Sequence, residues 1–155
     1  MKIVVDSNIV FSAILNTKSN IGQLIINGSR YFDFYTVGLL KEEVLNHKEK
    51  ITDLTNYTED QFAAVFQLIT SRIVFVDDIL LKDNDLAKAI VLVSNVDQND
   101  ALFIALANQL IANLWTGDKR LINGLKKKGY SRIITTDELY ELFLDKQLKS
   151  KRKRK

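Results

Sequence analysis

The chain of 155 residues contains no cysteine, no proline and a single histidine. Without cysteine it forms no disulfide and no thiolate metal site, which fits a reducing compartment. No apolar run approaches the ~20 residues that a membrane span requires, and the first residues lack a signal-peptide pattern. We therefore expect a cytoplasmic protein with no membrane association.

The formal net charge of +3 conceals an uneven distribution of charge. Residues 149–155 carry six of the 22 basic residues, so the other 16 bases face 19 acids. We expect one domain over residues 1–148, followed by a basic and disordered tail over residues 149–155. Such a tail either attracts polyanions without sequence specificity or serves only to keep the chain in solution.

Short apolar runs alternate with helical patterns along the chain. Ile3, Val4 and Val5 predict a first strand that is buried on both faces. Further strands are predicted at 32–36, 73–76, 113–116 and 132–134. Helices are predicted at 9–15, 21–27, 38–50, 58–69, 83–93, 97–110, 121–127 and 135–143. This alternation predicts an α/β fold, a three-layer α/β/α sandwich with a central, mainly parallel sheet of four to five strands.

Acidic residues recur where predicted strands end or predicted helices begin. Asp6 follows the first strand, Asp118 follows the fourth, Glu43 lies on the helix after the second, and Asp97 and Asp100 open a later helix. Each one alone is better explained as a helix cap, a turn residue or a solvated charge. Their recurrence at successive element ends favours a shared position at one edge of the sheet.

A cluster of carboxylates has a restricted chemistry. Neighbouring carboxylates repel one another unless they are protonated or bridged by cations. With no cysteine and one histidine, an all-oxygen site suits Mg²⁺ or Mn²⁺ and not Zn²⁺. These cations polarise a phosphodiester and activate water, so the pattern predicts phosphoryl hydrolysis.

Four segments resemble the ordered acidic motifs of PIN domains, and the resemblance runs from residue 1 to about residue 145. The segments are Val-Val-Asp-Ser-Asn-Ile at 4–9, Leu-Leu-Lys-Glu-Glu-Val at 39–44, Asp-Gln-Asn-Asp-Ala-Leu-Phe-Ile-Ala-Leu-Ala at 97–107 and Leu-Trp-Thr-Gly-Asp-Lys at 114–119. PIN domains are metal-dependent ribonucleases, and many are toxins of toxin–antitoxin pairs. The resemblance implies a PIN-like fold, endonucleolytic cleavage of RNA, homodimerisation and, for a toxin, an antitoxin protein as partner.

The resemblance also implies roles for individual residues. The residues implied to coordinate Mg²⁺ or Mn²⁺ and support catalysis are Asp6, Glu43, Asp100 and Asp118. Asp97 is implied as an additional ligand or as a residue that acts through one. Asn8 and Thr116 match polar residues that accompany the first and last acids, and we expect them to contact the substrate. Lys119, beside Asp118, is placed to neutralise an RNA phosphate.

Some alternatives stay open. Glu42 competes with Glu43, which we prefer because it precedes the apolar Val44, and Asp97 competes with Asp100. His47, one helical turn after Glu43, is either a general acid or, more simply, a capping residue.

Two other functions compete with the ribonuclease. A phosphatase of the haloacid-dehalogenase type would need a second Asp two residues after Asp6, where this chain has Asn8. A non-catalytic module that binds RNA or protein is the alternative from a different class.

Overall fold

The computed structural model of the protein describes residues 1–93 and 100–153. Its strands form one parallel sheet in the order β3-β2-β1-β4-β5, which places β1 at the centre. The strands are β1 (Lys2–Val5), β2 (Asp33–Val37), β3 (Val74–Val76), β4 (Asn113–Trp115) and β5 (Ile133–Ile134). The predicted α/β fold with a central parallel sheet is confirmed.

Helices connect the strands, as the sequence pattern predicts. They are α1 (Ser7–Leu15), α2 (Asn20–Gly28), α3 (Leu39–Asn46), α4 (Lys48–Thr55), α5 (Glu59–Thr70), α6 (Asp83–Leu92), α7 (Ala101–Leu110), α8 (Lys119–Lys127) and α9 (Thr136–Lys153), with a 3₁₀ turn, η1, at Asp78–Leu80. The prediction of one helix over 38–50 is wrong, because the chain leaves helical geometry at His47, where ψ is 14°.

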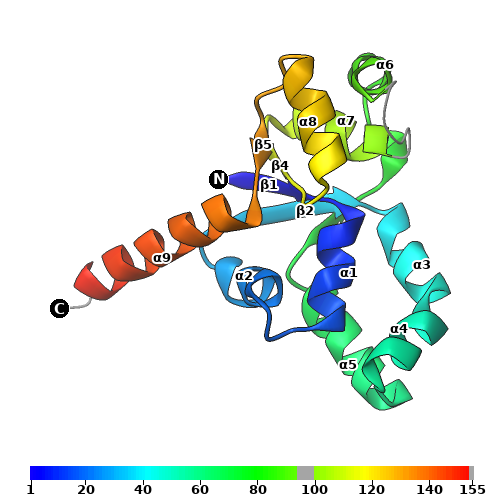
Figure 1. Ribbon diagram of the computed structural model, residues 1–155, viewed down its shortest axis with the longest axis vertical. Coiled ribbons are helices and arrows are strands. Elements are labelled where there is room, and N and C mark those ends of the chain that lie inside the picture. Colours follow the sequence, from blue (N-terminus) through cyan, green and yellow to red (C-terminus); the bar gives the residue numbers. More distant parts are fainter. Residues whose placement is uncertain (94–99, 154–155) are drawn as a thin grey trace.

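The helices cover the sheet on both sides. Figure 1 shows α6, α7 and α8 on one side of the strands and α1, α2 and α5 on the other. Helix α7 packs against β1, β2 and β4 and buries most of its length. Because β1 is covered on both faces, the side chains of Ile3, Val4 and Val5 are fully buried, each contributing about 1.5–3 kcal/mol of hydrophobic stabilisation.

Two hydrogen bonds fix the carboxyl end of the central strand. The Thr36 hydroxyl donates to the Val5 carbonyl at 2.7 Å, and the Asp6 backbone N–H donates to the Trp115 carbonyl at 3.3 Å. These bonds tie β1 to β2 and β4 at the point where β1 ends. The residues that follow the three central strands therefore meet at one edge of the sheet.

Within the described ranges, no single helix is long and apolar enough to cross a membrane, and α1 with α2 has the required length and composition only as a pair bent by 100°. Both helices of this pair bury apolar side chains, including Ile9 and Ile14 of α1 and Leu24 and Ile25 of α2, in the core.

The basic residues 149–153 are helical, where we expected a disordered tail. They continue α9, which ends at Lys153. Lys and Arg are good helix formers, and cations are favourable near the carboxyl end of a helix dipole. The high net charge of residues 149–153 was therefore not sufficient evidence for disorder.

Gly22 lets α2 begin close to the turn that follows α1. A Cβ atom at Gly22 would lie 2.5 Å from the Thr17 carbonyl oxygen, whereas one at Gly28, in the same helix, would meet nothing closer than 3.5 Å.

We expect Gly22→Ala to lower the free energy of unfolding by about 1–3 kcal/mol and Gly28→Ala to change it by less than about 1 kcal/mol. Urea denaturation measures both, and equal midpoints would contradict the close approach.

Candidate active site

A cavity of about 360 Å³ opens at the carboxyl edge of the sheet. Three of the predicted acids line it: Glu43 from α3, Asp100 from the start of α7 and Asp118 from the start of α8. The other lining residues are Ser7, Asn8, Val37, Leu39, Leu102 and Phe103. Acids that are far apart in the sequence therefore face one space.

Asp6 directly follows β1 and is only 3% exposed. It does not line this cavity, but it lies close enough to Asp118 for the two charges to interact. Burial raises the pKa of its carboxyl group, and the negative charge of Asp118 raises it further. Hydrogen bonds from the Thr116 hydroxyl and from the backbone N–H groups of Ile9 and Asn8 lower the pKa, but burial outweighs them. A buried carboxylate whose charge is incompletely balanced favours a nearby cation.

Thr116 connects Asp6 to Asp118. Its hydroxyl is hydrogen-bonded to the Asp6 side chain and accepts from the backbone N–H of Asp118 at 3.1 Å. The residue is completely buried, so in this arrangement it presents no surface to a substrate. The expected substrate contact is replaced by a positioning role, in which Thr116 holds two acids relative to each other.

Asp118 caps a helix and lines the cavity at the same time. Its Oδ1 accepts from the backbone N–H groups of Arg120 at 3.0 Å and Leu121 at 3.2 Å, at the start of α8. A carboxylate accepts through two oxygens, so a cap that uses one oxygen leaves the other to face the cavity. Capping and metal binding by this acid are compatible.

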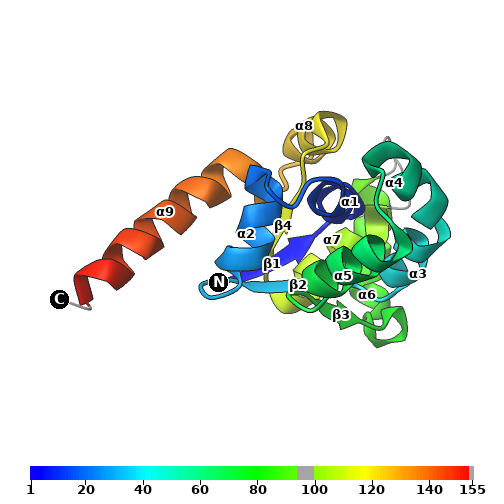
Figure 2. The same ribbon diagram turned by 90° about the horizontal axis from the view of Figure 1, so that it is seen from below.

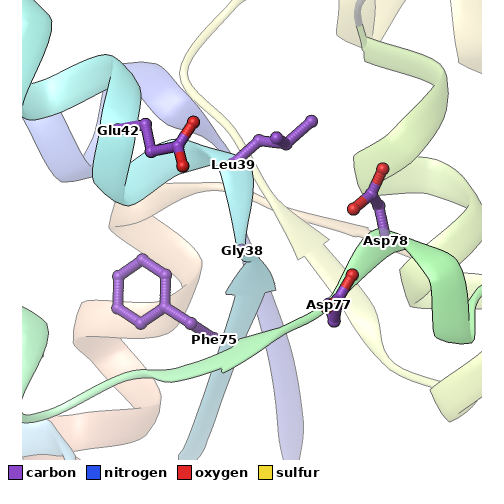
Figure 3. Close-up of a pocket in the computed structure, with 6 residues that line it drawn as sticks. All are labelled: Gly38, Leu39, Glu42, Phe75, Asp77 and Asp78. Carbon is purple, nitrogen blue, oxygen red and sulfur yellow. The ribbon is translucent and has the colours of Figure 1, made fainter.

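Glu42 and Glu43 face different cavities. Glu43 lines the cavity with Asp100 and Asp118, whereas Glu42 lines a neighbouring one of about 300 Å³ with Asp77 and Asp78 (Figure 3). The geometry therefore favours Glu43 in the acidic group around Asp6. Sequence reasoning missed Asp77 and Asp78, although they follow β3 directly and so carry the strand-end signal that singled out Asp6.

Residues around the acids differ in their access to the cavity. Asn8 is exposed and lines the cavity. Ser7 is partly buried and also lines it, although the sequence analysis did not single it out. Lys119 is exposed at the first residue of α8, next to Asp118. His47 lies at the junction of α3 and α4, where its Nδ1 is 2.7 Å from the Glu43 carbonyl oxygen. The capping role of His47 is thus confirmed.

The donor atoms suit a hard divalent cation, because all the acids offer carboxylate oxygens. Within residues 1–93 and 100–153, however, no three acidic or histidine side chains already form a metal-binding group. Asp97 lies outside the described residues. The side chains that line the cavity fit Mg²⁺ or Mn²⁺ by chemistry, and they would have to move closer together to bind it.

A sequence model of the PIN domain matches residues 4–141. The chain belongs to the PIN domain family. The match includes Asp6, Glu43, Asp100 and Asp118 and spans the sheet from β1 to β5. No curated protein matches the chain in a sequence comparison. PIN domains are commonly metal-dependent nucleases that act on RNA.

The burial of Asp6 predicts a stability gain from removing its charge. In Asp6→Asn, the side-chain oxygen still accepts from Ile9, which donates to Asp6 at 3.0 Å, while the buried charge is lost. We expect this variant to have a higher thermal midpoint than the wild type at pH 7 in a metal chelator.

The sign of the pH dependence follows from the raised pKa of Asp6. The folded state binds this proton more tightly than the unfolded state, so the wild type loses stability as pH rises from 3.8 through the raised pKa. The difference in thermal midpoint between Asp6→Asn and the wild type should therefore become smaller at low pH. A lower midpoint for Asp6→Asn at pH 7 would show that the carboxylate acts mainly as a cap.

Proposed function

We propose that this PIN domain is a metal-dependent endoribonuclease that hydrolyses phosphodiester bonds in RNA. The observation that carries the proposal is the convergence of Glu43, Asp100 and Asp118, from three separate helices, on one cavity at the carboxyl edge. Asp6, buried beside them, adds a fourth carboxylate. A purely structural role for each acid would not require them to share a cavity.

The chain's own residues would hold Mg²⁺ or Mn²⁺ through Asp6, Glu43, Asp100 and Asp118, with Asp97 as a further ligand. A divalent cation supplies polarisation of the phosphoryl group and an activated water. The Asp118 backbone N–H donates to the Thr116 hydroxyl at 3.1 Å, which would hold the last acid near Asp6.

Substrate would enter beside the acids. Asn8 and Lys119 are both exposed and offer an amide and an ammonium group to RNA phosphates. Helices α1 and α8 begin at Asp6 and Asp118, so their positive dipole ends point into the same region. In the absence of a cation the carboxylates would repel RNA, so metal binding and substrate binding would depend on each other.

A non-catalytic RNA- or protein-binding module is the second candidate. It is favoured by the observation that the described residues form no ready three-ligand group. On this alternative the acids would serve as helix caps, as Asp6 and Asp118 do. Binding of metal distinguishes the two functions.

We further propose a protein partner, as in the PIN domains that are toxins inhibited by antitoxins. A cavity of about 350 Å³ with mainly apolar walls lies between α1 and α4, away from the acids, and Leu54 at its rim is 64% exposed. Its lining residues are Phe11, Leu15, His47, Lys50, Ile51 and Leu54. A neighbouring gene for a small DNA-binding protein would support the toxin role, and native mass spectrometry would test the expected homodimer.

Two adjacent residues offer a matched test of the active site. We expect Glu43→Gln to lower the rate of RNA cleavage at least about 100-fold, because it removes a metal ligand. Glu42→Gln removes the same charge from the same helix but faces the neighbouring cavity, so its rate should stay within about 3-fold of the wild type, allowing for a change in local potential. Cleavage of a fluorescent RNA at saturating Mn²⁺ measures both, and equal effects would reject the assignment.

Metal binding should stabilise the fold directly. At Mn²⁺ concentrations of about 100 times the dissociation constant, the expected stabilisation is about 2.7 kcal/mol, which raises the thermal midpoint by about 5–10 °C for a chain of this size. Asp118→Asn should lose most of this increase, whereas Asp53→Asn, at an exposed position of α4, should keep it. Failure of Mn²⁺ to raise the midpoint of the wild type would favour the non-catalytic module.

A further inference from the structure

Helix α9 packs on the body as far as Lys146, whose ammonium group lies 5.9 Å from the centre of the Phe32 ring. Its last buried residue is Phe143, whose ring lies 6.0 Å from that of Tyr31. Beyond Lys146 the helix leaves the body, as Figures 1 and 2 show for the end of α9, drawn in red. We call residues 147–153 the arm.

The arm concentrates positive charge. Its basic residues are Lys149, Lys151, Arg152 and Lys153. Lys149 pairs with Asp145 at 3.0 Å, but both side chains are more than half exposed, so the pair contributes little. Among the described residues no ion pair involves positions 151–153. Residues 1–148 have more acids than bases, so the arm differs in sign from the body that carries it.

The directions of the basic side chains indicate the kind of partner. Successive residues of a helix turn by about 100°, so Lys149, Lys151, Arg152 and Lys153 spread over about 200° of the circumference of the arm. A helix that lies on a membrane needs an apolar face separated from its basic face. In the described part of α9, the exposed large apolar side chains nearest these bases are Leu144 and Leu148. Lys151 and Arg152 point to either side of these two leucines, so the apolar side chains have no face separate from the bases. This arrangement suits phosphate contacts along a nucleic-acid backbone.

The position of the arm sets the length of RNA that it can affect. Helix α9 starts next to the active site, where the Trp115 indole N–H donates to the Thr136 hydroxyl at 3.1 Å. Residues 149–153 follow 13–17 positions later, about 20–25 Å along the helix. Both views show α9 leaving the body near the N-terminus, whereas Asp6 lies at the other end of β1. A short RNA in the cavity cannot reach the arm.

We propose that the arm binds the phosphate backbone of long RNA, without sequence specificity, while another part of the same RNA occupies the active site. This inference rests on the proposed ribonuclease function, because it takes RNA as the substrate. The arm raises the affinity for long RNA and leaves the chemistry in the cavity unchanged.

The test compares two sets of four substitutions in the full chain carrying Asp6→Asn, which prevents cleavage during binding. The arm variant replaces Lys149, Lys151, Arg152 and Lys153 with Gln. The control replaces four exposed lysines elsewhere, Lys18, Lys82, Lys88 and Lys127, with Gln, so both sets change the net charge equally. Circular dichroism checks that the helical content is kept.

Fluorescence anisotropy measures binding of single-stranded RNA of about 25 and about 5 nucleotides over a range of salt. We expect the arm variant to bind the longer RNA about 10-fold more weakly near 0.1 M salt, with a salt slope smaller by about 2–3. The control variant should stay close to the parent, and all proteins should bind the shorter RNA alike. Equal losses in both variants, or a loss on the short RNA, would overturn the proposal.

Two further measurements distinguish RNA binding by the arm from membrane binding and from a failure of the active site. Anionic lipid vesicles that bind the parent more tightly than RNA does, and lose this binding in the arm variant, would assign the arm to membranes and overturn the proposal. With Asp6 intact, cleavage of the short RNA tests the ribonuclease function. If the short RNA is not cleaved but the arm still binds long RNA, only the proposed ribonuclease function is wrong. If the short RNA is cleaved and the arm variant binds long RNA as tightly as the parent, only the proposed role of the arm is wrong.

Discussion

The burial of one carboxylate, Asp6, is the constraint on which the arrangement of the site depends. The apolar strand β1 carries it to the carboxyl edge of the sheet, where α1 and Thr116 supply hydrogen bonds to it. Those bonds do not fully balance the loss of water, so burial keeps its pKa raised. With Asp118 adding like charge, the site disfavours its own ionised form until a cation is present.

The other acids are held with different firmness at the carboxyl edge of the sheet. Acidic and basic residues also lie in different parts of the molecule, the acids at this edge and the bases at the end of α9. Asp118 is fixed because it caps α8 and because its N–H donates to the buried Thr116 hydroxyl, whereas Glu43 is an exposed side chain on α3 with more rotational freedom. The exposed end of α9 carries bases, which suit a polyanion as the acids suit a cation. Because α9 separates the arm from the sheet, the bases do not neutralise the acids that the proposed reaction requires.

The fold class could be predicted from the sequence alone, and so could the gathering of Glu43, Asp100 and Asp118 at one edge of the sheet. Buried β-branched runs alternating with helical patterns allow little besides a parallel sheet, and acids at element ends then fall on one edge. The helical period does not, however, say which of Glu42 and Glu43 faces which cavity, because consecutive helical residues point about 100° apart. That choice depends on how α3 packs after β2.

Burial and helix length were decided only by the tertiary structure. Thr116 looked like a substrate contact, yet it follows β4 where that strand pairs with β1, and it has no exposed surface. The charge of the basic segment suggested disorder, but α9 packs against α2 and continues as a helix through residues 149–153, whereas residues 154–155 lie outside the described part of the chain. The burial of Thr116 and the length of α9 depend on contacts between segments that are far apart in the chain. Such contacts cannot be predicted from local composition.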